Sequence, residues 1–588
     1  MPNGSSKAVD PIHHYASLIE SCLTTRHLKL GRFIHCHLIK TALNLNVFLA
    51  NRIIHMYSKL DSFESAHNAF DELPITNTHS WNTIISACCR FGLFDRAQKL
   101  FDEMPEPNLV SYNSIISGFS HHGFHKQAID VFKRMQKQYN SLLIDKFTVV
   151  SMVSTCANLG TLELLRQVHG ALAVIGIEIN LIMYNVLIDA YGKCGDPDAS
   201  YKVFSQMEER DVVSWTSMVV AYVRASQLEN AYLVFNQMPV KNAISWTALI
   251  TGLAQNGWGV EALDLFVQMQ EEGIPPSAFT FVGLLSACAD LALIERGKQL
   301  HGCITRNGDR SDLFNVFIFN ALIDMYAKCG DMKSGKRLFE KIPEKDIISW
   351  NSMITGFAQN GYGEESLMAF NKMTEEGVTP NHVTFLGVLT ACSHTGLVSK
   401  GRHFLELMEK DFGVCPRSDH YAILIDMLGR MNRLEEAVEL INNAPHGPDR
   451  IGMWGALLGG CRVHGNLDLA RRAAEALFEL EPWNAARYVM LSNIYAAAKR
   501  WDDSRRVRTL MKERRLKKDV AYSIIEVRNA RHWFVAEDKS HCQTDGIYEV
   551  IDILADQMKE AGFLPYPYDG HLFILDEDDG LLSQVCNE

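Results

Sequence analysis

Asparagine and threonine side chains recur along this chain at intervals of 31 residues. The first series is Asn51, Asn82 and Asn113, the second is Asn185, Thr216 and Thr247, and the third is Asn320 and Asn351. A carboxamide and a hydroxyl offer different sets of hydrogen-bond donors and acceptors, so such a row can distinguish polar groups on a ligand. Both residue types are also common helix caps, which is the simpler interpretation of any single one of them.

Helical repeats are predicted to hold these residues in register. Residues 80–106 are SWNTIISACCRFGLFDRAQKLFDEMPE, and the same pattern begins again at Ser214, Ser245 and Ser349. Within each copy, apolar residues at helical spacing fill two segments of about a dozen residues, separated by a polar or glycine-containing turn. Each copy is therefore expected to be a helical hairpin. Because a hairpin cannot bury its apolar faces alone, neighbouring hairpins must stack into a solenoid with one long concave surface.

The composition narrows the class of protein. The 588 residues are 47% hydrophobic and 21% charged, as in a folded protein, and no apolar run approaches the roughly 20 residues that span a bilayer. A net charge of -12 argues against a nucleic acid as the ligand, because phosphate groups favour basic surfaces. The objection does not hold for a nucleic acid that is contacted mainly through its bases. The 14 cysteines recur within the repeats, as in TACSH and YGKCG, and are expected to be reduced, packed thiols in an intracellular compartment.

The repeat sequences carry a family resemblance. VVSWTSMVVAY and VFIFNALIDMYAKCG resemble pentatricopeptide repeat (PPR) motifs, whereas the W-x-x-L-G-x-x-Y signature of tetratricopeptide repeats is absent. The order of short, standard and long repeats is similar to the S, P and L types of the PLS subclass of land-plant PPR proteins. The resemblance implies an all-α fold, a right-handed superhelical solenoid of antiparallel helix pairs, without catalytic residues, metal or cofactor.

Thirteen repeats are expected between residues 12 and 449, after an N-terminal tail of residues 1–11. Repeats 1 to 13, with their types, are 12–46 (L), 47–77 (S), 78–108 (short), 109–145 (P), 146–180 (L), 181–211 (S), 212–242 (S), 243–277 (P), 278–315 (L), 316–346 (S), 347–381 (P), 382–417 (L) and 418–449 (S). Apparent insertions fall around Gln138–Leu142 and Asn307–Leu313, where a loop tolerates them.

The C-terminal region departs from the repeat pattern. Residues 450–516 resemble the degenerate E-type repeats of editing factors, and residues 517–588 resemble the E+ extension. In the extension, alternating apolar and polar residues around Asn529-Ala530 predict a β-hairpin. A helix and a short acidic tail are expected to follow.

In this family, the fifth and last residues of a repeat together choose one RNA base, and an apolar second residue stacks on that base. The pairs that imply uridine are Asn113 with Asp145, Asn185 with Asp211, and Asn320 with Asp346. Those that imply cytidine, or a pyrimidine generally, are Asn51 with Asn77, Asn82 with Asn108, and Asn351 with Asn381. Thr216 with Asn242 implies adenosine, and Thr247 with Ser277 implies a purine.

The L-like repeats have apolar fifth residues, Ala16, Val150, Val282 and Leu386, which are expected to be spacers of weak preference. This restriction of Asn and Thr to the other repeat types favours base selection over helix capping. The target implied, written 5′ to 3′, is N-C-C-U-N-U-A-A-N-U-C-N-N, with the last S-like repeat four nucleotides before an edited cytidine. The resemblance thus implies a site-recognition factor for organelle C-to-U RNA editing that binds single-stranded organelle RNA.

Longer relatives carry a DYW-type cytidine deaminase, whose zinc is held by one His and two Cys with a Glu as proton shuttle. This chain contains neither H-x-E nor C-x-x-C, and its 22 histidines show no metal-ligand spacing. It ends about where that domain would begin. We therefore expect a DYW-type deaminase to act in trans, recruited by the E-type and E+ segments, with MORF-type accessory proteins on the L-like repeats.

Several alternatives stay open. The chain could instead be an organelle splicing or RNA-stability factor without editing, or a protein-scaffolding helical repeat. The ten basic residues of Lys499–Lys518 fit a phosphate contact and a solvated helix face equally well. The family implies a mitochondrion, with the chloroplast as alternative, although MPNGSSKAVDP lacks the Arg-rich pattern of a transit peptide. Four tryptophans are expected to pack inside the repeats rather than stack on bases: Trp81, Trp215, Trp246 and Trp350.

Overall fold

The computed structural model describes residues 11–139, 145–176, 178–306, 315–444, 450–517, 522–527, 530–535 and 539–561. Several predicted features lie wholly or mostly outside these residues: the N-terminal tail, both insertions, the turn residue Asn529 and the acidic tail.

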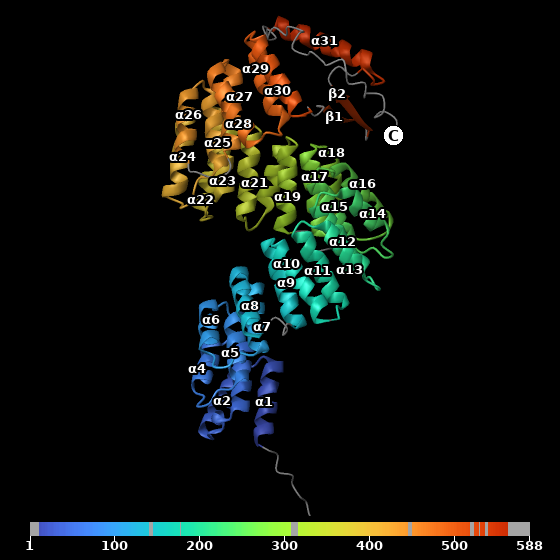
Figure 1. Ribbon diagram of the computed structural model, residues 1–588. Helices are drawn as coiled ribbons and strands as arrows, with labels where there is room; N and C mark the ends of the chain where they lie inside the picture. The colour runs from blue at the N-terminus through green and yellow to red at the C-terminus, as the bar shows by residue number, and fades with distance from the viewer. Residues whose placement is uncertain are drawn as a thin grey trace, which may run out of the picture. The chain divides into compact units, whose positions relative to one another are not determined.

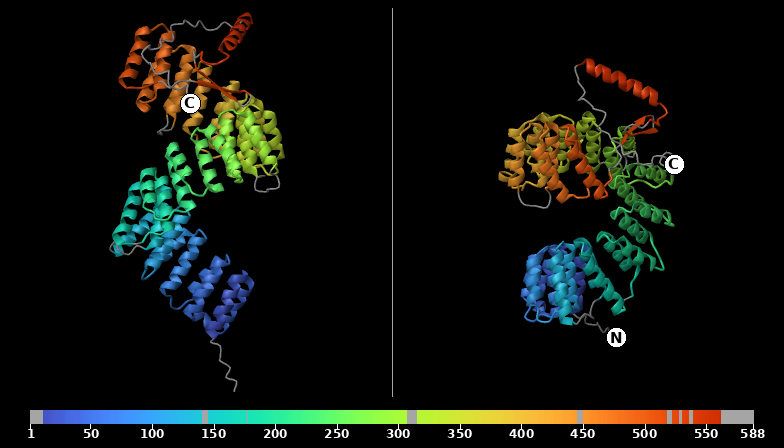
Figure 2. Two further views of the ribbon diagram at one scale, coloured as in Figure 1. Left: turned by 90° about the vertical axis from the view of Figure 1, so that its right-hand side faces the viewer. Right: turned by 45° about the horizontal axis from the view of Figure 1, so that its top comes forward.

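The chain divides into two compact units, Met1–Thr280 and Phe281–Glu588. Within each unit, helices run in antiparallel pairs that stack side by side, as Figures 1 and 2 show. The helices of the N-terminal unit are α1 (Pro11–Thr25), α2 (Leu28–Lys40), the 3-10 helix η1 (Leu43–Leu45), α3 (Val47–Lys59), α4 (Phe63–Asp71), α5 (Thr78–Arg90), α6 (Phe94–Glu103), α7 (Leu109–His121), α8 (His125–Tyr139), α9 (Lys146–Leu159), α10 (Leu162–Ile175), α11 (Leu181–Lys193), α12 (Pro197–Ser205), α13 (Val212–Arg224), α14 (Leu228–Asn236), α15 (Ala243–Gln255) and α16 (Gly259–Glu271).

Helix α17 (Ala278–Asp290) contains the division between the units. The C-terminal unit continues with α18 (Ile294–Arg306), α19 (Val316–Lys328), α20 (Met332–Lys341), α21 (Ile347–Gln359), α22 (Gly363–Glu375), α23 (His382–Thr395), α24 (Val398–Lys410), α25 (Ser418–Arg430), α26 (Leu434–Asn443), α27 (Ile451–His464), α28 (Leu467–Leu480), α29 (Ala485–Ala497), α30 (Trp501–Glu513), β1 (Tyr522–Val527), β2 (Ala530–Val535) and α31 (Thr544–Glu560).

Each expected repeat from the second to the thirteenth starts at the first residue of a helix. In all of these except the thirteenth, where Arg417 precedes the helix, the local cause is a cap. The residue just before the helix accepts a backbone N–H of the first turn through its side-chain oxygen. Asn108 before α7 and Asp211 before α13 are examples. Such a cap contributes about 1 kcal/mol and determines where the helix begins.

Tryptophans of the recurring Ser-Trp motif join consecutive repeats. Trp350 is 1% exposed, and its ring meets Phe339 of the preceding helix edge-on, with centroids 4.9 Å apart. Trp215 meets Phe204 in the same way at 4.9 Å, an arrangement that aromatic pairs favour. The prediction that these tryptophans are packing residues is confirmed.

Small residues allow the first helices of successive repeats to approach closely. Gly429 of α25 and Gly460 of α27 face each other, and a Cβ built on Gly460 would lie 2.8 Å from the Cα of Gly429. This contact belongs to a continuous core in the C-terminal unit that includes Leu424, Leu457 and Tyr488.

The C-terminal β-hairpin pairs β1 with β2 in antiparallel register, from Tyr522 opposite Val535 to Val527 opposite Ala530. The predicted fold class, helix-pair repeats with a small β-hairpin near the C-terminus, is confirmed. Among the described helices, none combines the length and the apolar character needed to cross a membrane.

Candidate nucleic-acid interface

The fifth residue of one repeat and the cap of the next repeat lie side by side. Asn185 is in the second turn of α11, and its Nδ2 donates to Oδ1 of Asp211 at 3.2 Å. The same oxygen accepts the backbone N–H of Ser214 at 2.8 Å and its hydroxyl at 2.7 Å. Burial alone would raise the pKa of Asp211, but the hydrogen bonds from Ser214 and Asn185 outweigh it and lower that pKa.

Most of the other predicted pairs are joined in the same way. The remaining hydrogen-bonded pairs are Asn51–Asn77 (3.4 Å), Asn82–Asn108 (3.4 Å), Asn113–Asp145 (2.8 Å), Thr247–Ser277 (3.3 Å), Asn320–Asp346 (3.1 Å) and Asn351–Asn381 (3.2 Å). The sequence series therefore corresponds to a row of two-residue sites, one for each repeat concerned.

Thr216 and Asn242 form the exception. The hydroxyl of Thr216 donates to the carbonyl of Val212 at 2.7 Å, and Asn242 caps α15 through Ser245. Within the described residues, no hydrogen bond joins Thr216 to Asn242. Thr247 makes the same bond to a carbonyl one turn back, that of Ala243 at 2.7 Å, and still contacts Ser277, so this bond alone does not account for the exception.

Helix capping explains the last residue of each pair. Asn77, Asn108, Asp145 and Asp346 are all N-cap residues. The restriction of Asn and Thr to certain repeat types favours base selection over capping for the fifth residues alone. The fifth residues lie inside their helices and cap nothing. A last residue thus has two tasks, beginning a helix and accepting a hydrogen bond from the preceding repeat.

Exposed apolar side chains stand beside these pairs. The second and fifth residues of a repeat are three apart on one helix, and therefore share a face. The second residues are large, apolar and exposed in most repeats: Phe48, Val110, Phe147, Ile182, Val213, Ile244, Phe279, Phe317, Ile348 and Val383. A periodic row of exposed apolar groups beside polar pairs suits a ligand with flat apolar faces and polar edges.

The fifth residues of the L-like repeats offer no such hydrogen bond. Ala16 is buried, and Val150, Val282 and Leu386 are half-buried. They are apolar, so the row of polar pairs is interrupted at these repeats, as expected.

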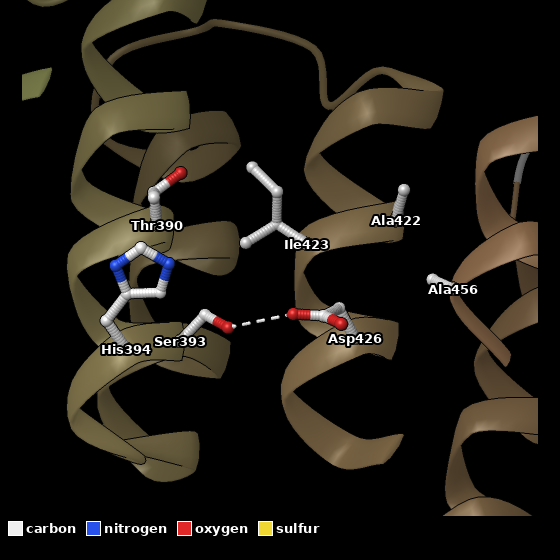
Figure 3. A pocket seen from close by; sticks show the side chains of 7 residues that line it. All are labelled: Thr390, Ser393, His394, Ala422, Ile423, Asp426 and Ala456. Carbon is white, nitrogen blue, oxygen red and sulfur yellow. Dashed lines mark hydrogen bonds between the residues drawn. The ribbon is translucent and has the colours of Figure 1, made fainter. Parts of the chain in front are cut away.

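Repeat 13 carries Ala422 at the fifth position, and a shallow hollow of about 330 Å³ opens beside it. Figure 3 shows Ser393 of α23 facing Asp426 of α25 across this hollow. The hydroxyl of Ser393 donates to Asp426 at 3.3 Å, and Arg430 donates to the same carboxylate at 2.9 Å. The carboxylate of Asp426 is therefore already paired with Arg430 of the same helix.

Part of the basic segment Lys499–Lys518, of which residues 499–517 are described, is engaged within the protein. Arg500 pairs with Asp503 at 2.6 Å, Arg508 donates to Ser492 at 2.9 Å, and Arg514 donates to Tyr488. Arg505 and Arg506 of the same helix remain 82% exposed, so these contacts do not decide between a phosphate contact and a solvated helix face.

The cysteines in the described part of the chain join no cluster of metal-ligating side chains. All thirteen described cysteines are free thiols, and burial raises the pKa of Cys89 to about 12 and that of Cys156 to about 11. Protonated, buried thiols are poor nucleophiles and poor metal ligands. The prediction of reduced, packed thiols is confirmed for most of them, while Cys36, Cys415 and Cys542 are exposed.

One group of residues beside the pairs was not predicted from the sequence. The third residue of the following repeat is Ser or Thr and is fully buried, as in Ser214, Ser349 and Thr384. A signal was present, because a Ser or Thr stands two residues before many fifth positions, for example in the Ser-Trp motif.

Stacked helix pairs with a periodic row of polar pairs define this chain as a helical-repeat protein. Residues 107–158, 241–290 and 345–394 match the PPR repeat family. Residues 76–105, 182–212, 213–242, 317–347 and 419–443 match the PPR repeat, and residues 464–526 match the E motif.

Full-length relatives agree with these matches. The chain is 37% identical over 551 residues to the pentatricopeptide repeat-containing protein At2g13600 of Arabidopsis thaliana, covering 93% of this chain and 74% of the relative. It is 33% identical over 557 residues to the chloroplastic protein CRR2 of Arabidopsis thaliana, covering 94% and 74%. The chain belongs to the pentatricopeptide repeat family, as a plant member of the E subgroup.

A solved structure supports the fold. The pentatricopeptide repeat protein PPR10, crystallised with an 18-nt psaJ RNA element, superposes with a TM-score of 0.52 at 16% identity. The match covers 88% of this chain and 82% of PPR10.

Proposed function

We propose that this protein binds single-stranded organelle RNA sequence-specifically and acts as a site-recognition factor for C-to-U editing. The observation that carries the proposal is the row of fifth and last residues joined by hydrogen bonds, such as Asn185 with Asp211. Paired in this way, each fifth residue retains a polar group for the edge of one base, while the exposed second residue offers a stacking surface. The RNA-bound structure of PPR10 supports RNA as the ligand.

The acidic net charge is compatible with this ligand. A protein that contacts bases through amides, hydroxyls and apolar side chains needs few phosphate contacts. Its affinity should then fall only weakly with salt, because few counterions are released on binding.

The proposed target is N-C-C-U-N-U-A-A-N-U-C-N-N, placed four nucleotides before the edited cytidine. The sixteen base-selecting residues are the fifth and last residues of repeats 2, 3, 4, 6, 7, 8, 10 and 11, as assigned from the sequence. The PLS subclass, with L-like repeats as weak spacers, belongs to the same proposal.

Deamination is proposed to be supplied in trans by a DYW-type partner, with MORF-type accessory proteins on the L-like repeats. Helix α31 exposes apolar side chains along its length, namely Val550, Ile551, Leu554 and Met558. This supports the C-terminal region as a recruitment surface. An exposed apolar helix face of this kind favours a protein partner.

The compartment is proposed to be the mitochondrion, with the chloroplast as alternative. Some relatives are named as mitochondrial, such as At2g03880, and others as chloroplastic, such as CRR2. Organelle transcript sequencing in a null line identifies the compartment and the edited site together.

Exchange of one base-selecting pair tests the proposal directly. The double variant Asn185→Thr, Asp211→Asn should move the preference at the sixth nucleotide from uridine to adenosine, measured by filter binding to RNA oligonucleotides that differ only there. Unchanged preference would exclude base selection by this pair.

A null line separates the editing function from the alternatives. Editing that is lost in the null line and restored by the wild-type protein supports an editing factor. Intact editing with defective splicing or unstable transcripts supports the splicing or stability factor. A protein that binds none of these RNAs would be a scaffold instead.

A further inference from the structure

A second hollow, of about 590 Å³, opens beside the helix pair α29–α30 and is here called the E-type hollow. Of the described residues that line it, two are cationic and none is acidic. The cations are Arg462 of α27 and Lys517 after α30, and Trp483 just before α29 forms a third part of the rim. Asn493 and mainly apolar side chains of α29 form most of the remaining wall.

The E-type hollow lies on the same face of its helices as the base-selecting pairs. Counted from the first residue of each helix, Arg462 is at position 12 of α27 and Asn493 at position 9 of α29. The hollow of Figure 3 uses the same two positions, with Ser393 on α23 and Asp426 on α25. Position 5, which selects bases in the repeats, lines both hollows. The surface proposed to bind RNA therefore continues into the E-type helix pairs.

The two hollows differ in charge. The first contains the carboxylate of Asp426, which is paired with Arg430. In the E-type hollow an uncharged residue, Asn493, takes the place of that acid. Arg462 and Lys517 are exposed, and neither forms an ion pair with another described residue. Two free cations at the rim of an acid-free hollow suit an anionic ligand such as a phosphate group.

Trp483 adds a flat apolar surface to this hollow. Its side chain is 70% exposed, whereas Trp350 of the repeats is 1% exposed. The tryptophans of the Ser-Trp motif thus serve packing, and Trp483 does not. An exposed aromatic ring beside free cations suits a nucleotide, because every base has a flat face that stacks on such a ring.

Asn493 presents a hydrogen-bond donor to the hollow. Its Oδ1 accepts from the guanidinium of Arg508 at 3.2 Å, and the same guanidinium donates to Ser492 at 2.9 Å. The orientation of the carboxamide is thereby fixed, and Nδ2 makes no hydrogen bond within the described residues. Carbonyl oxygens and ring nitrogens of a base can accept from it.

We propose that the E-type hollow binds one further nucleotide of the RNA strand, beyond the last repeat. The base stacks on Trp483, and its phosphate lies beside Arg462 and Lys517. This inference rests on the proposed RNA-binding function. At one nucleotide per helix pair, α27–α28 lies opposite nucleotide 14 and α29–α30 opposite nucleotide 15, between the target of repeats 1 to 13 and the edited cytidine at nucleotide 17. Stacking tolerates any base, so this site holds the strand without selecting its sequence.

The test compares a short RNA that ends at nucleotide 13 with a long RNA that continues to nucleotide 17. The wild-type chain should bind the long RNA more tightly. Trp483→Ala should weaken binding of the long RNA about tenfold, as loss of one stacked base implies, and leave binding of the short RNA unchanged. An abasic nucleotide 15 should weaken wild-type binding by a similar factor and have no further effect on Trp483→Ala.

Charge variants and a control complete the test. Arg462→Gln and Lys517→Gln should each reduce the salt dependence of long-RNA binding by about one phosphate contact and leave that of the short RNA unchanged. Trp501→Ala is the matched control, because Trp501 is 45% exposed and does not line the hollow, and it should bind both RNAs like the wild type. Thermal unfolding is measured in parallel. The abasic RNA needs no variant, and decides the matter where Trp483→Ala does not fold.

Three outcomes would overturn the inference. The first is equal affinity of the wild type for the short and long RNAs, and the second is an equal loss on both RNAs in Trp483→Ala. The third is Trp483→Ala that binds both RNAs normally but no longer supports editing, which would make the hollow a protein-docking site.

Failure of the proposed function gives a different result. A wild-type chain that does not prefer the short RNA over a scrambled RNA of the same length lacks base selection itself. A wild-type chain that makes this distinction but gains nothing from nucleotides 14 to 17 contradicts only the E-type site.

Discussion

The amide of Asn113 donates a hydrogen bond to the carboxylate of Asp145 at 2.8 Å, although 32 residues separate them in the chain. Asp145 is also the N-cap of α9, where it accepts the backbone N–H of Thr148 at 2.9 Å. One carboxylate thus connects the start of a helix with the preceding repeat. Substitutions at such a residue alter stability and ligand choice together unless the replacement retains the cap.

Asp145→Asn separates the two tasks, because Asn and Asp are about equally good caps. We expect the free energy of unfolding to change by less than about 0.5 kcal/mol, while the preference at nucleotide 4 moves from uridine to cytidine. Urea unfolding and oligonucleotide binding measure the two effects. Asp145→Ala is the control, and should lose about 1 kcal/mol with the cap. A destabilised Asp145→Asn with unchanged base preference would contradict the assignment.

Phe317→Ala tests the second-position residues as stacking surfaces. Phe317 is 67% exposed, so its removal should leave the unfolding midpoint unchanged, but a lost base stack should weaken RNA binding about tenfold or more. Phe33 on α2 is 70% exposed and stands outside the predicted interface, which makes Phe33→Ala the matched control. Equal affinity losses in both variants would indicate a non-specific effect of exposed aromatic rings.

The sequence predicts which residues lie at this interface better than it predicts the hydrogen bonds between them. Periodic spacing is enough to place Asn185 on a first helix, because helix pairs repeat with the sequence. It cannot distinguish Ser214 from Ser349, since both stand in a Ser-Trp motif and differ only in which acceptors their hydroxyls reach. Likewise, the family pattern pairs Thr216 with Asn242, but in the described residues the hydroxyl of Thr216 bonds the carbonyl of Val212 and no hydrogen bond joins the pair.

The paired aspartates should make stability depend on pH. Burial alone would raise the pKa of Asp346, but hydrogen bonds from Ser349 and Asn320 outweigh it and lower that pKa. A carboxylate with a lowered folded pKa stabilises the fold above its unfolded pKa of about 3.9, and this contribution is lost as pH falls through the folded value. The difference in unfolding free energy between wild type and Asp346→Asn should therefore shrink below about pH 4. A difference that stays constant from neutral to acid pH would show that the charge of Asp346 contributes nothing.

The close contact between α25 and α27 makes adjacent glycines respond oppositely to alanine. At Gly460, an added Cβ would lie 2.8 Å from the Cα of Gly429, whereas at Gly459 it would meet no atom within 4 Å. Gly460→Ala must therefore separate the two helices, and we expect a loss of about 1–3 kcal/mol in the free energy of unfolding. Gly459→Ala has the same helix-propensity gain without the clash, and should be neutral or stabilise by up to about 1 kcal/mol. Urea unfolding of the two variants checks this contrast, and similar values for both would mean that the helices do not touch at Gly460.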